Sequence, residues 1–320
     1  MKLSRAIDGF LLHKQAEGRS PRTIADYRVC LRKLRTFTND PPLADVDLPQ
    51  LRRFFAHLAK AQHTPDGIAP RGTHKLSDKT IKNIHAAISS MYTWLIQENL
   101  HAGPNPMRRI ARPKPALPPI DPLTQDQVVA LIAATRQTSA WHNRPTVTSQ
   151  RHTARRDRAI VLLLLDTGLR ASEVCNLRLD DYDQSTGHLT VRRGKGNKGR
   201  TVRVERSTAS ALWRYLSERP DLEPDAPLFA NSRTGGKLSR HALGRLLKRL
   251  GRRAGVADIY PHRFRHTFAI EFLRNNGDIY TLQQILGHTS LDMVRRYLKI
   301  VQTDLDQKHR TASPVKNWGL

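Results

Sequence analysis

Apolar residues recur at helical spacing through the first hundred residues of the chain. Four stretches place them three or four residues apart, the period of an amphipathic helix. Ser20 before Pro21, and Ser77 before the fourth stretch, are favoured N-cap residues. The apolar positions are Leu3, Ala6, Ile7, Phe10 and Leu11; Ile24, Tyr27, Leu31 and Leu34; Leu51, Phe54, Phe55 and Leu58; and Ile81, Ile84, Ile88, Met91 and Leu95. The pattern predicts a small helical domain over residues 1–103, interrupted by a polar loop at 62–75.

The pattern changes twice beyond this domain. Residues 104–122 are rich in proline, arginine and lysine, which is typical of a stiff basic linker. Thr124 and Gln127 then form a capping-box pattern, and residues 159–165 are continuously apolar, as in a buried helix. Residues 189–193 and 201–204 alternate like strands around a glycine- and lysine-rich turn. We therefore expect a mainly α fold with a small β-sheet: a helical domain, an α+β domain over 123–300, and a tail over 301–320.

The charge balance narrows the class of partner. Lysine and arginine number 54 against 28 aspartate and glutamate, giving a net charge of +26. Such an excess favours a polyanion, which is DNA, RNA or an anionic membrane surface. The apolar run 159–165 is too short to span a bilayer, and the N-terminus lacks the pattern of a signal peptide. The two cysteines do not suggest a disulfide framework. The sequence predicts a soluble cytoplasmic protein without a membrane partner.

Five short pieces of the second half carry candidate chemistry. They are Thr167 to Glu173, the turn Gly194 to Gly199, Pro261 to Thr267, Leu286 to His288, and Tyr297. Each is a weak signal alone. Neither metal-ligand spacing nor a nucleotide-binding GxxxxGK[ST] loop is found in the sequence, so we expect no metal and no cofactor.

The residue types suit phosphate chemistry. Arg170 and Arg265 offer planar, permanently charged guanidiniums that can meet charge on phosphate oxygens. Glu173 lies three residues after Arg170, a spacing that lets it orient that guanidinium. His262 and Arg265 share a spacing of three at the start of a helix, where an anion is favoured. Taken singly, each arginine could be a surface cation, and His266 a hydrogen-bonded packing residue.

In this order, with Tyr297 nine residues after His288, the pieces resemble the catalytic set of tyrosine recombinases, the family of phage integrases and Xer-type resolvases. The resemblance implies that Tyr297 is the nucleophile, that Lys195 is the general acid, and that Arg170, Arg265, His262 and His288 stabilise the phosphate. A phenol suits this reaction because it attacks when deprotonated and leaves again afterwards. Lys198 on the same turn is the alternative acid, and either lysine could simply contact the backbone phosphates.

The resemblance also implies a mechanism and an assembly. Cutting and rejoining would pass through a 3′-phosphotyrosyl intermediate, a free 5′-hydroxyl and a Holliday junction, without ATP or metal. A SAM-like core-binding domain and the catalytic domain would form a C-shaped clamp on double-stranded DNA with inverted-repeat core sites. The protein would be a monomer off DNA and a homo-tetramer on synapsed DNA. It would act in a prokaryotic cytoplasm and be associated with the nucleoid. Whether an accessory DNA-bending protein takes part is left open.

The same residues are also compatible with other functions. A type IB topoisomerase would share the nucleophile and the arginines, although the lysine turn and the helical first domain disfavour it. A non-catalytic DNA clamp would explain charge and helices without chemistry. Among competing tyrosines, Tyr280 is interpreted as a packing residue because apolar residues follow it. The apolar tail with Trp318 is either a segment that docks on a neighbouring protomer or a disordered terminus.

Overall fold

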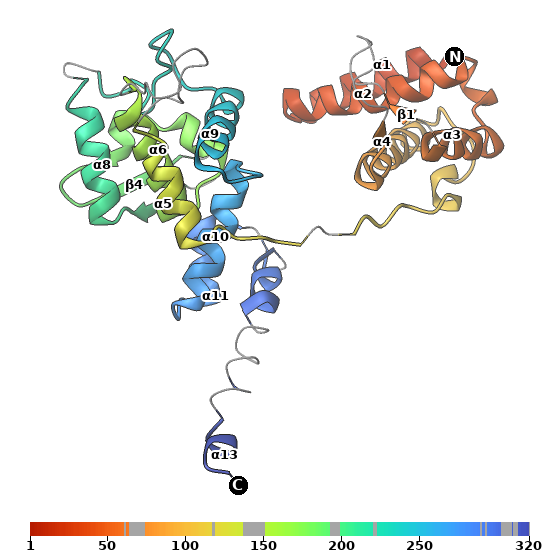
Figure 1. Ribbon diagram of the computed structural model, residues 1–320. Coiled ribbons are helices and arrows are strands. Elements are labelled where there is room, and N and C mark those ends of the chain that lie inside the picture. The colour runs from red at the N-terminus through yellow and green to blue at the C-terminus, as the bar shows by residue number, and fades with distance from the viewer. Residues whose placement is uncertain are drawn as a thin grey trace, which may run out of the picture. The chain divides into compact units, whose positions relative to one another are not determined.

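A computed structural model gives the fold of the chain (Figure 1). It divides into two compact units, Met1–Pro118 and Pro119–Leu320. Within the described residues, no helix combines the length and apolarity needed to cross a membrane. The structure describes residues 1–60, 62–63, 74–116, 119–136, 151–192, 199–219, 223–288, 290–291, 293–301, 309 and 313–319.

The first unit is helical, as the hydrophobic spacing predicted. Ser20 and Ser77 cap their helices by accepting the backbone N–H of Thr23 and Thr80, both at 3.2 Å. The residues predicted as a polar loop are not wholly irregular, because two-residue strands at its ends pair in antiparallel fashion. The elements are α1 (Leu3–Ala16), α2 (Pro21–Thr38), η1 (Leu43–Asp45), α3 (Leu48–Lys60), β1 (Gln62–His63), β2 (His74–Lys75), α4 (Asp78–Gln97) and η3 (Pro106–Arg109).

Helix α4 supplies much of the core of this unit. Ile84, Ile88 and Met91 are fully buried on it. The first residues of the predicted linker pack against the same helix: Met107 is 1% exposed, and the amide of Asn105 donates to the Ser89 carbonyl at 2.9 Å. The start of the predicted linker, up to η3, is therefore packed against α4 and belongs to the first unit.

The second unit surrounds helix α6 and carries one antiparallel sheet of order β3-β4-β5 among the described residues. The sequence pattern predicted β4 and β5 but not the two-residue β3. Residues 293–301 are also helical. The other elements are α5 (Gln125–Ala133), α6 (Ala154–Thr167), α7 (Ala171–Asn176), η4 (Leu179–Asp181), β3 (Tyr182–Asp183), β4 (His188–Val191), β5 (Arg200–Arg203), α8 (Arg206–Leu216), α9 (Arg240–Ala254), α10 (Pro261–Arg274), α11 (Ile279–Leu286) and α13 (Pro314–Asn317).

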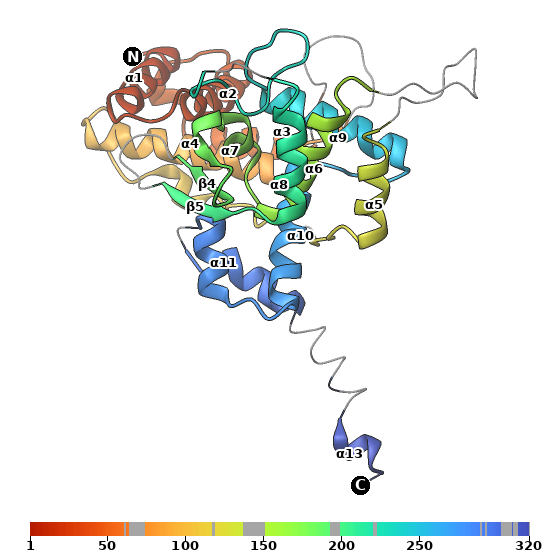
Figure 2. The ribbon, with the colours of Figure 1, turned by 90° about the vertical axis from the view of Figure 1, so that its left-hand side faces the viewer.

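Two hydrophobic clusters stabilise this unit. Helices α8 and α9 lie on either side of α6 (Figures 1 and 2), whose residues Ile160, Leu163 and Leu164 are fully buried. The second cluster joins α10, α11 and the helix at 293–301 through residues such as Ile270, Leu282 and Tyr297. The C-terminal end of α6 thus meets a separate packed layer, and the candidate residues gather at that junction.

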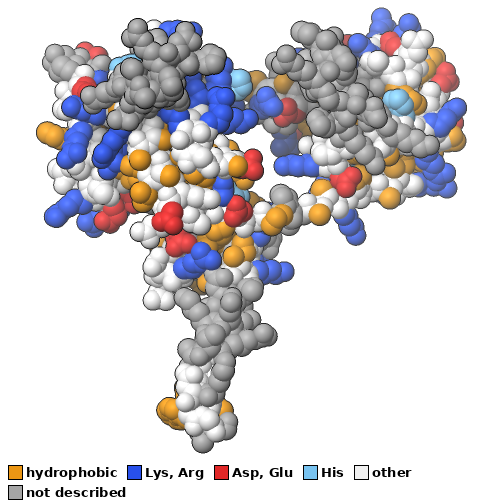
Figure 3. Space-filling view, viewed as in Figure 1, with side chains coloured by type: hydrophobic (Ala, Val, Ile, Leu, Met, Phe, Trp, Pro, Cys, Tyr) orange, Lys and Arg blue, Asp and Glu red, His pale blue; other side chains and the backbone are white. Residues whose placement is uncertain are grey.

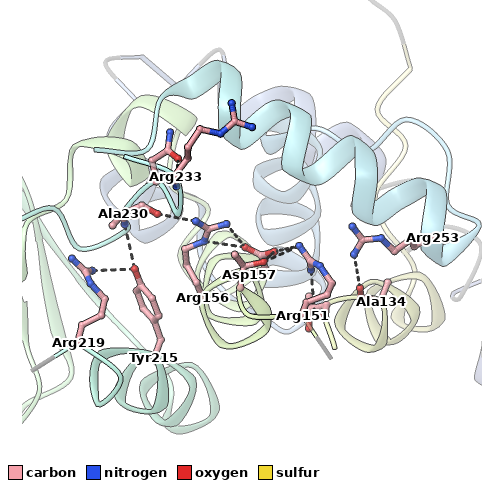
Figure 4. A network of polar contacts seen from close by, with 12 residues as sticks. Ala134, Arg151, Arg156, Asp157, Tyr215, Arg219, Ala230, Arg233 and Arg253 are labelled. Atoms are coloured by element: carbon pink, nitrogen blue, oxygen red, sulfur yellow. Dashed lines mark hydrogen bonds and ion pairs between the residues drawn. The ribbon is translucent and has the colours of Figure 1, made fainter. Parts of the chain in front are cut away.

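A buried ionic network fixes the other end of α6 (Figure 4). The Asp157 carboxylate is 0% exposed and accepts from Arg151, Arg156 and the Thr153 hydroxyl. Arg156 also donates to the Ala230 carbonyl at 2.8 Å, which ties the start of α6 to the segment before α9. A buried carboxylate persists only when it is paired in this way.

Candidate active site

The C-terminal end of α11 collects three arginines. The last carbonyls of a helix have no partner within it and carry partial negative charge. Here Arg200 donates to the Ile285 carbonyl at 2.6 Å, Arg265 to Leu286 at 2.8 Å and Arg170 to Gly287 at 3.1 Å. The three guanidiniums come from β5, α10 and the start of α7, so one helix end aligns side chains that are far apart in sequence.

Gly168 permits this arrangement at the end of α6. Its φ of +59° is a left-handed conformation that favours glycine. A Cβ at this position would lie 2.6 Å from the Phe268 ring and 2.9 Å from Leu286. The Gly168 carbonyl accepts from Arg265 at 2.9 Å. The chain then continues through buried Leu169 to Arg170, which precedes α7.

Glu173 is clamped between two arginines. Its carboxylate accepts from Arg170 at 2.9 Å and from both terminal nitrogens of Arg200 at 3.0 and 2.9 Å. Burial alone would raise the pKa of Glu173, but hydrogen bonds from Arg200 and from the Arg170 backbone amide outweigh it and hold the pKa at about 2. Glu173 therefore stays ionised and orients both guanidiniums.

If the chain cleaves DNA as its resemblance to tyrosine recombinases implies, replacing Glu173 by glutamine should slow strand cleavage on the order of 10²-fold, because a neutral amide cannot hold both guanidiniums in place. Single-turnover cleavage of a radiolabelled core-site duplex measures this. Glu218→Gln is the matched control, since Glu218 forms an exposed ion pair with Arg155 at 3.1 Å. Equal rates in both variants would contradict the orienting role.

Arg265 and His288 leave two buried donors unsatisfied. The Arg265 guanidinium is 1% exposed and lies 2.6 Å from Nε2 of His288. Arginine has no acceptor, so this Nε2 accepts and the proton of the neutral ring sits on Nδ1. That Nδ1 and the Arg265 Nε are buried and have no hydrogen-bond partner among the described residues. Unsatisfied buried donors are rare in folded proteins and are suited to receive an anion.

The pKa values of this group reflect crowding of positive charge. Burial, with the charge of Arg170 next, lowers the pKa of Arg265 to about 10. Burial, Arg265 and Arg170 together lower the pKa of His288 to about 4. Three guanidiniums facing one carboxylate leave two net positive charges. A phosphodiester that gains a fifth oxygen reaches two negative charges, so the group is electrostatically matched to that transition state.

Tyr297 lies beside this group with its hydroxyl 2.8 Å from Nδ1 of His266. The tyrosine is 1% exposed and packs in the second hydrophobic cluster. Burial raises the pKa of Tyr297, while the charges of Arg265, Arg296 and Arg170 oppose the rise. Burial, with His262 next, lowers the pKa of His266 to about 4, so this ring is neutral near pH 7.

The structure brings most of the predicted set together. Arg170, Glu173, Arg265 and His288 are joined by hydrogen bonds around the end of α11. The exposed His262 stands at the start of α10, with its ring 4.3 Å from that of His266. Lys195 and Lys198 lie outside the described residues.

Sequence reasoning missed two residues and misplaced one. Arg200 was not singled out, although it follows directly on the glycine-rich turn. His266 was interpreted as a hydrogen-bonded packing residue, but its partner was not predicted: it is Tyr297, 31 residues further along the chain. The interpretation of Tyr280 as a packing residue is wrong, because its side chain is 65% exposed. Helix α11 buries Leu282 and Leu286 instead, and Tyr280 projects from another face.

Comparisons with known proteins agree with this geometry. Residues 122–303 match the model of the phage integrase family, and residues 7–99 match that of the phage integrase N-terminal SAM-like domain. The chain is 31% identical over 317 residues to tyrosine recombinase XerA of Pyrococcus furiosus, covering 98% of this chain and 96% of the relative. It is also 31% identical over 322 residues to tyrosine recombinase XerD of Mycobacterium tuberculosis, covering 98% of each.

A solved structure supports the fold. The Tn1549 transposon integrase in complex with a circular intermediate DNA superimposes with a TM-score of 0.71 at 17% identity, covering 94% of this chain and 99% of that chain. At this identity the likeness concerns the fold alone. The predicted fold class, a SAM-like helical domain followed by a catalytic domain with a small sheet, is confirmed.

Proposed function

Because this chain belongs to the phage integrase family and is a tyrosine site-specific DNA recombinase, we propose that Tyr297 is its nucleophile and that Arg170, Arg265 and His288 bind the scissile phosphate. The observation that carries the proposal is the pair of unsatisfied buried donors, Arg265 Nε and His288 Nδ1, within a group of net positive charge. Glu173 positions the Arg170 guanidinium and does not touch the substrate.

The steps follow from the placement of these groups. The Tyr297 hydroxyl gives its proton to Nδ1 of the neutral His266 ring, which lies 2.8 Å away. The Tyr297 oxygen attacks phosphorus, the bond to the 5′-oxygen breaks, and a 3′-phosphotyrosyl ester retains the energy of the phosphodiester. Arg170, Arg265, His262 and His288 meet the charge that develops on the non-bridging oxygens. The 5′-oxygen takes a proton from Lys195, with Lys198 as the alternative. Attack by the partner strand's 5′-hydroxyl then rejoins DNA and leads to a Holliday junction.

The burial of Tyr297 makes cleavage conditional. A ring that is 1% exposed cannot reach a phosphate of a DNA duplex, so the helix at 293–301 has to shift when DNA binds. The hydrogen bond to His266 holds the hydroxyl until then and restrains its direction. The DNA-free enzyme is thereby kept from reacting with other phosphates.

The assembly is part of the same proposal. Two molecules bind the inverted repeats of one core site, and two such complexes form a homo-tetramer around synapsed DNA, while the protein is a monomer off DNA. The tail of residues 301–320 docks on a neighbouring protomer, which is consistent with the exposure of Val315 and Trp318. We place the reaction in a prokaryotic cytoplasm, on nucleoid DNA.

A nicked suicide duplex tests the chemistry. Its short cleaved fragment diffuses away, so the covalent intermediate accumulates and migrates as a shifted band in denaturing gels. Mapping the DNA-linked peptide by mass spectrometry should identify Tyr297. A wild-type protein that binds its attachment site but forms no adduct would defeat the proposal in favour of a non-catalytic clamp.

Acid is expected to destabilise the second unit through two half-buried histidines, His266 and His288. The unfolded chain binds a proton at each below the usual pKa of 6.5, whereas folded His266 and His288 remain neutral down to about pH 4. The unfolded state therefore binds more protons in this window, and stability falls as pH drops from 6.5 to 4. Denaturant midpoints across this window should decline less steeply in His288→Gln than in the parent; parallel curves would contradict this.

A further inference from the structure

An arginine-lined cavity lies at the opposite end of α6 from the candidate active site. Its volume is about 790 Å³, and it is formed by residues after α5, the first turns of α6 and one side of α8. Arg136, Arg158 and Arg214 line it together with Trp213. In Figure 3, Lys and Arg side chains gather over the α8 side of this unit.

The cavity is separate from the catalytic group. Arg158 precedes Gly168 by ten residues along α6, which corresponds to about 15 Å of helix. Helix α8 contributes to the cavity, whereas the catalytic residues lie on α10, just before α7, after the end of α11 and on the helix at 293–301. The proposed chemistry of strand cleavage does not use these arginines.

Among the described residues, the positive charge of the cavity is not neutralised by carboxylates. In the described part of the chain, no carboxylate lies within ion-pair distance of Arg136, Arg158 or Arg214, and only Arg155 in the lining has one, Glu218 at 3.1 Å. Residues 137–150, outside the described part, contain neither Asp nor Glu. Burial lowers the pKa of Arg158, and the charges of Arg136 and Arg214 lower it further, so the three repel one another.

The neighbouring arginines of α6 show the contrast. Arg156 lies in the buried network of Figure 4, where Asp157 and the Ala230 carbonyl satisfy its guanidinium. It serves the fold. Arg158, two residues on, is half-buried, lines the cavity and has no carboxylate partner in the described part of the chain. Arginines held close against mutual repulsion are stabilised by a bound anion.

We propose that this cavity binds phosphodiester groups of DNA outside the segment held at the active site. Guanidinium forks match phosphate oxygens, and three of them suit a backbone carrying repeated charges. Trp213, 60% exposed beside them, offers a face on which an unpaired base can stack. The DNA is either a single strand, whose base then covers Trp213, or a duplex flanking the core site, held by its backbone.

Salt-dependent binding of DNA tests the site. A fluorescent oligothymidylate and a fluorescent duplex lacking the core site are titrated with the full chain at several NaCl concentrations. Loss of one phosphate contact lowers the slope of log K against log salt by about 0.7 for a single strand or about 0.9 for a duplex. Arg214→Ala should show this loss. Arg206→Ala, an equal charge change at an exposed site of α8 outside the cavity lining, should not.

The two probes distinguish an unpaired strand from duplex DNA that flanks the core site. Loss with oligothymidylate alone, accompanied by weaker binding of Trp213→Ala, assigns an unpaired strand, and loss with the duplex alone assigns flanking DNA. Unchanged slopes for Arg214→Ala with both probes, or equal losses in Arg214→Ala and Arg206→Ala, would overturn the proposal. Because neither probe is cleaved, this outcome is independent of whether Tyr297 is the nucleophile.

Discussion

Replacing Tyr297 by phenylalanine is expected to reduce the covalent protein–DNA adduct by about 10⁴-fold or more, because no other group can replace the lost oxygen as nucleophile. Binding to the attachment site should persist, since the ring keeps its place in the second hydrophobic cluster and loses only the hydrogen bond to His266. Adduct formation on a nicked suicide duplex and binding in native gels measure the two effects separately.

Tyr280→Phe is the matched control for this experiment. It removes the same atom from a tyrosine that is 65% exposed on α11, and it should form adduct at the parental rate. An undiminished adduct in Tyr297→Phe, or loss in both variants, would reject Tyr297 as the nucleophile. Loss of DNA binding in Tyr297→Phe would show instead that the hydroxyl is needed for the fold of the helix at 293–301.

The sequence predicted local elements better than contacts between them. Helix α4 could be placed because its cap Ser77 and its apolar positions are local signals. The strand β3 was not predicted because two residues are too few to show the alternation of apolar and polar side chains that marks a strand. Tyr280 was misplaced because apolar neighbours in sequence do not decide which face of a helix is buried, and packing against α10 decided it.

The candidate site shows the same limit. Arg170, Arg265, His288 and Tyr297 could be proposed from motifs, because their spacing within short segments is a resemblance that needs no tertiary structure. The clamp of Arg200 on Glu173 and the collection of arginines at the end of α11 join residues up to 117 positions apart. Such contacts depend on how β5 and α11 pack together. No periodicity in the chain encodes that packing.

The buried carboxylate of Asp157 is expected to be the most destabilising single position to truncate. Asp157→Ala leaves Arg151 and Arg156, both with side chains 10% exposed, without their counter-charge. Breaking a buried ion pair from one side costs about 3–5 kcal/mol. For a unit of this size, that lowers the thermal midpoint on the order of 10 °C. The effect should centre on α6, because the network in Figure 4 fixes its first turns against the segment before α9.

Chemical denaturation of the full chain gives the free energy, and hydrogen exchange of peptides from α6 shows whether the loss is local to the second unit. Glu218→Ala removes the exposed carboxylate that forms an ion pair with Arg155 on the same unit. It should change the free energy of unfolding by no more than about 1 kcal/mol. Asp157→Asn separates charge from shape: it preserves volume but not the counter-charge, so it should resemble Asp157→Ala. If Asp157→Asn is as stable as the parent, hydrogen bonding alone holds the network, and the two arginines do not need a buried anion. If Asp157→Ala costs no more than Glu218→Ala, the network does not stabilise the end of α6.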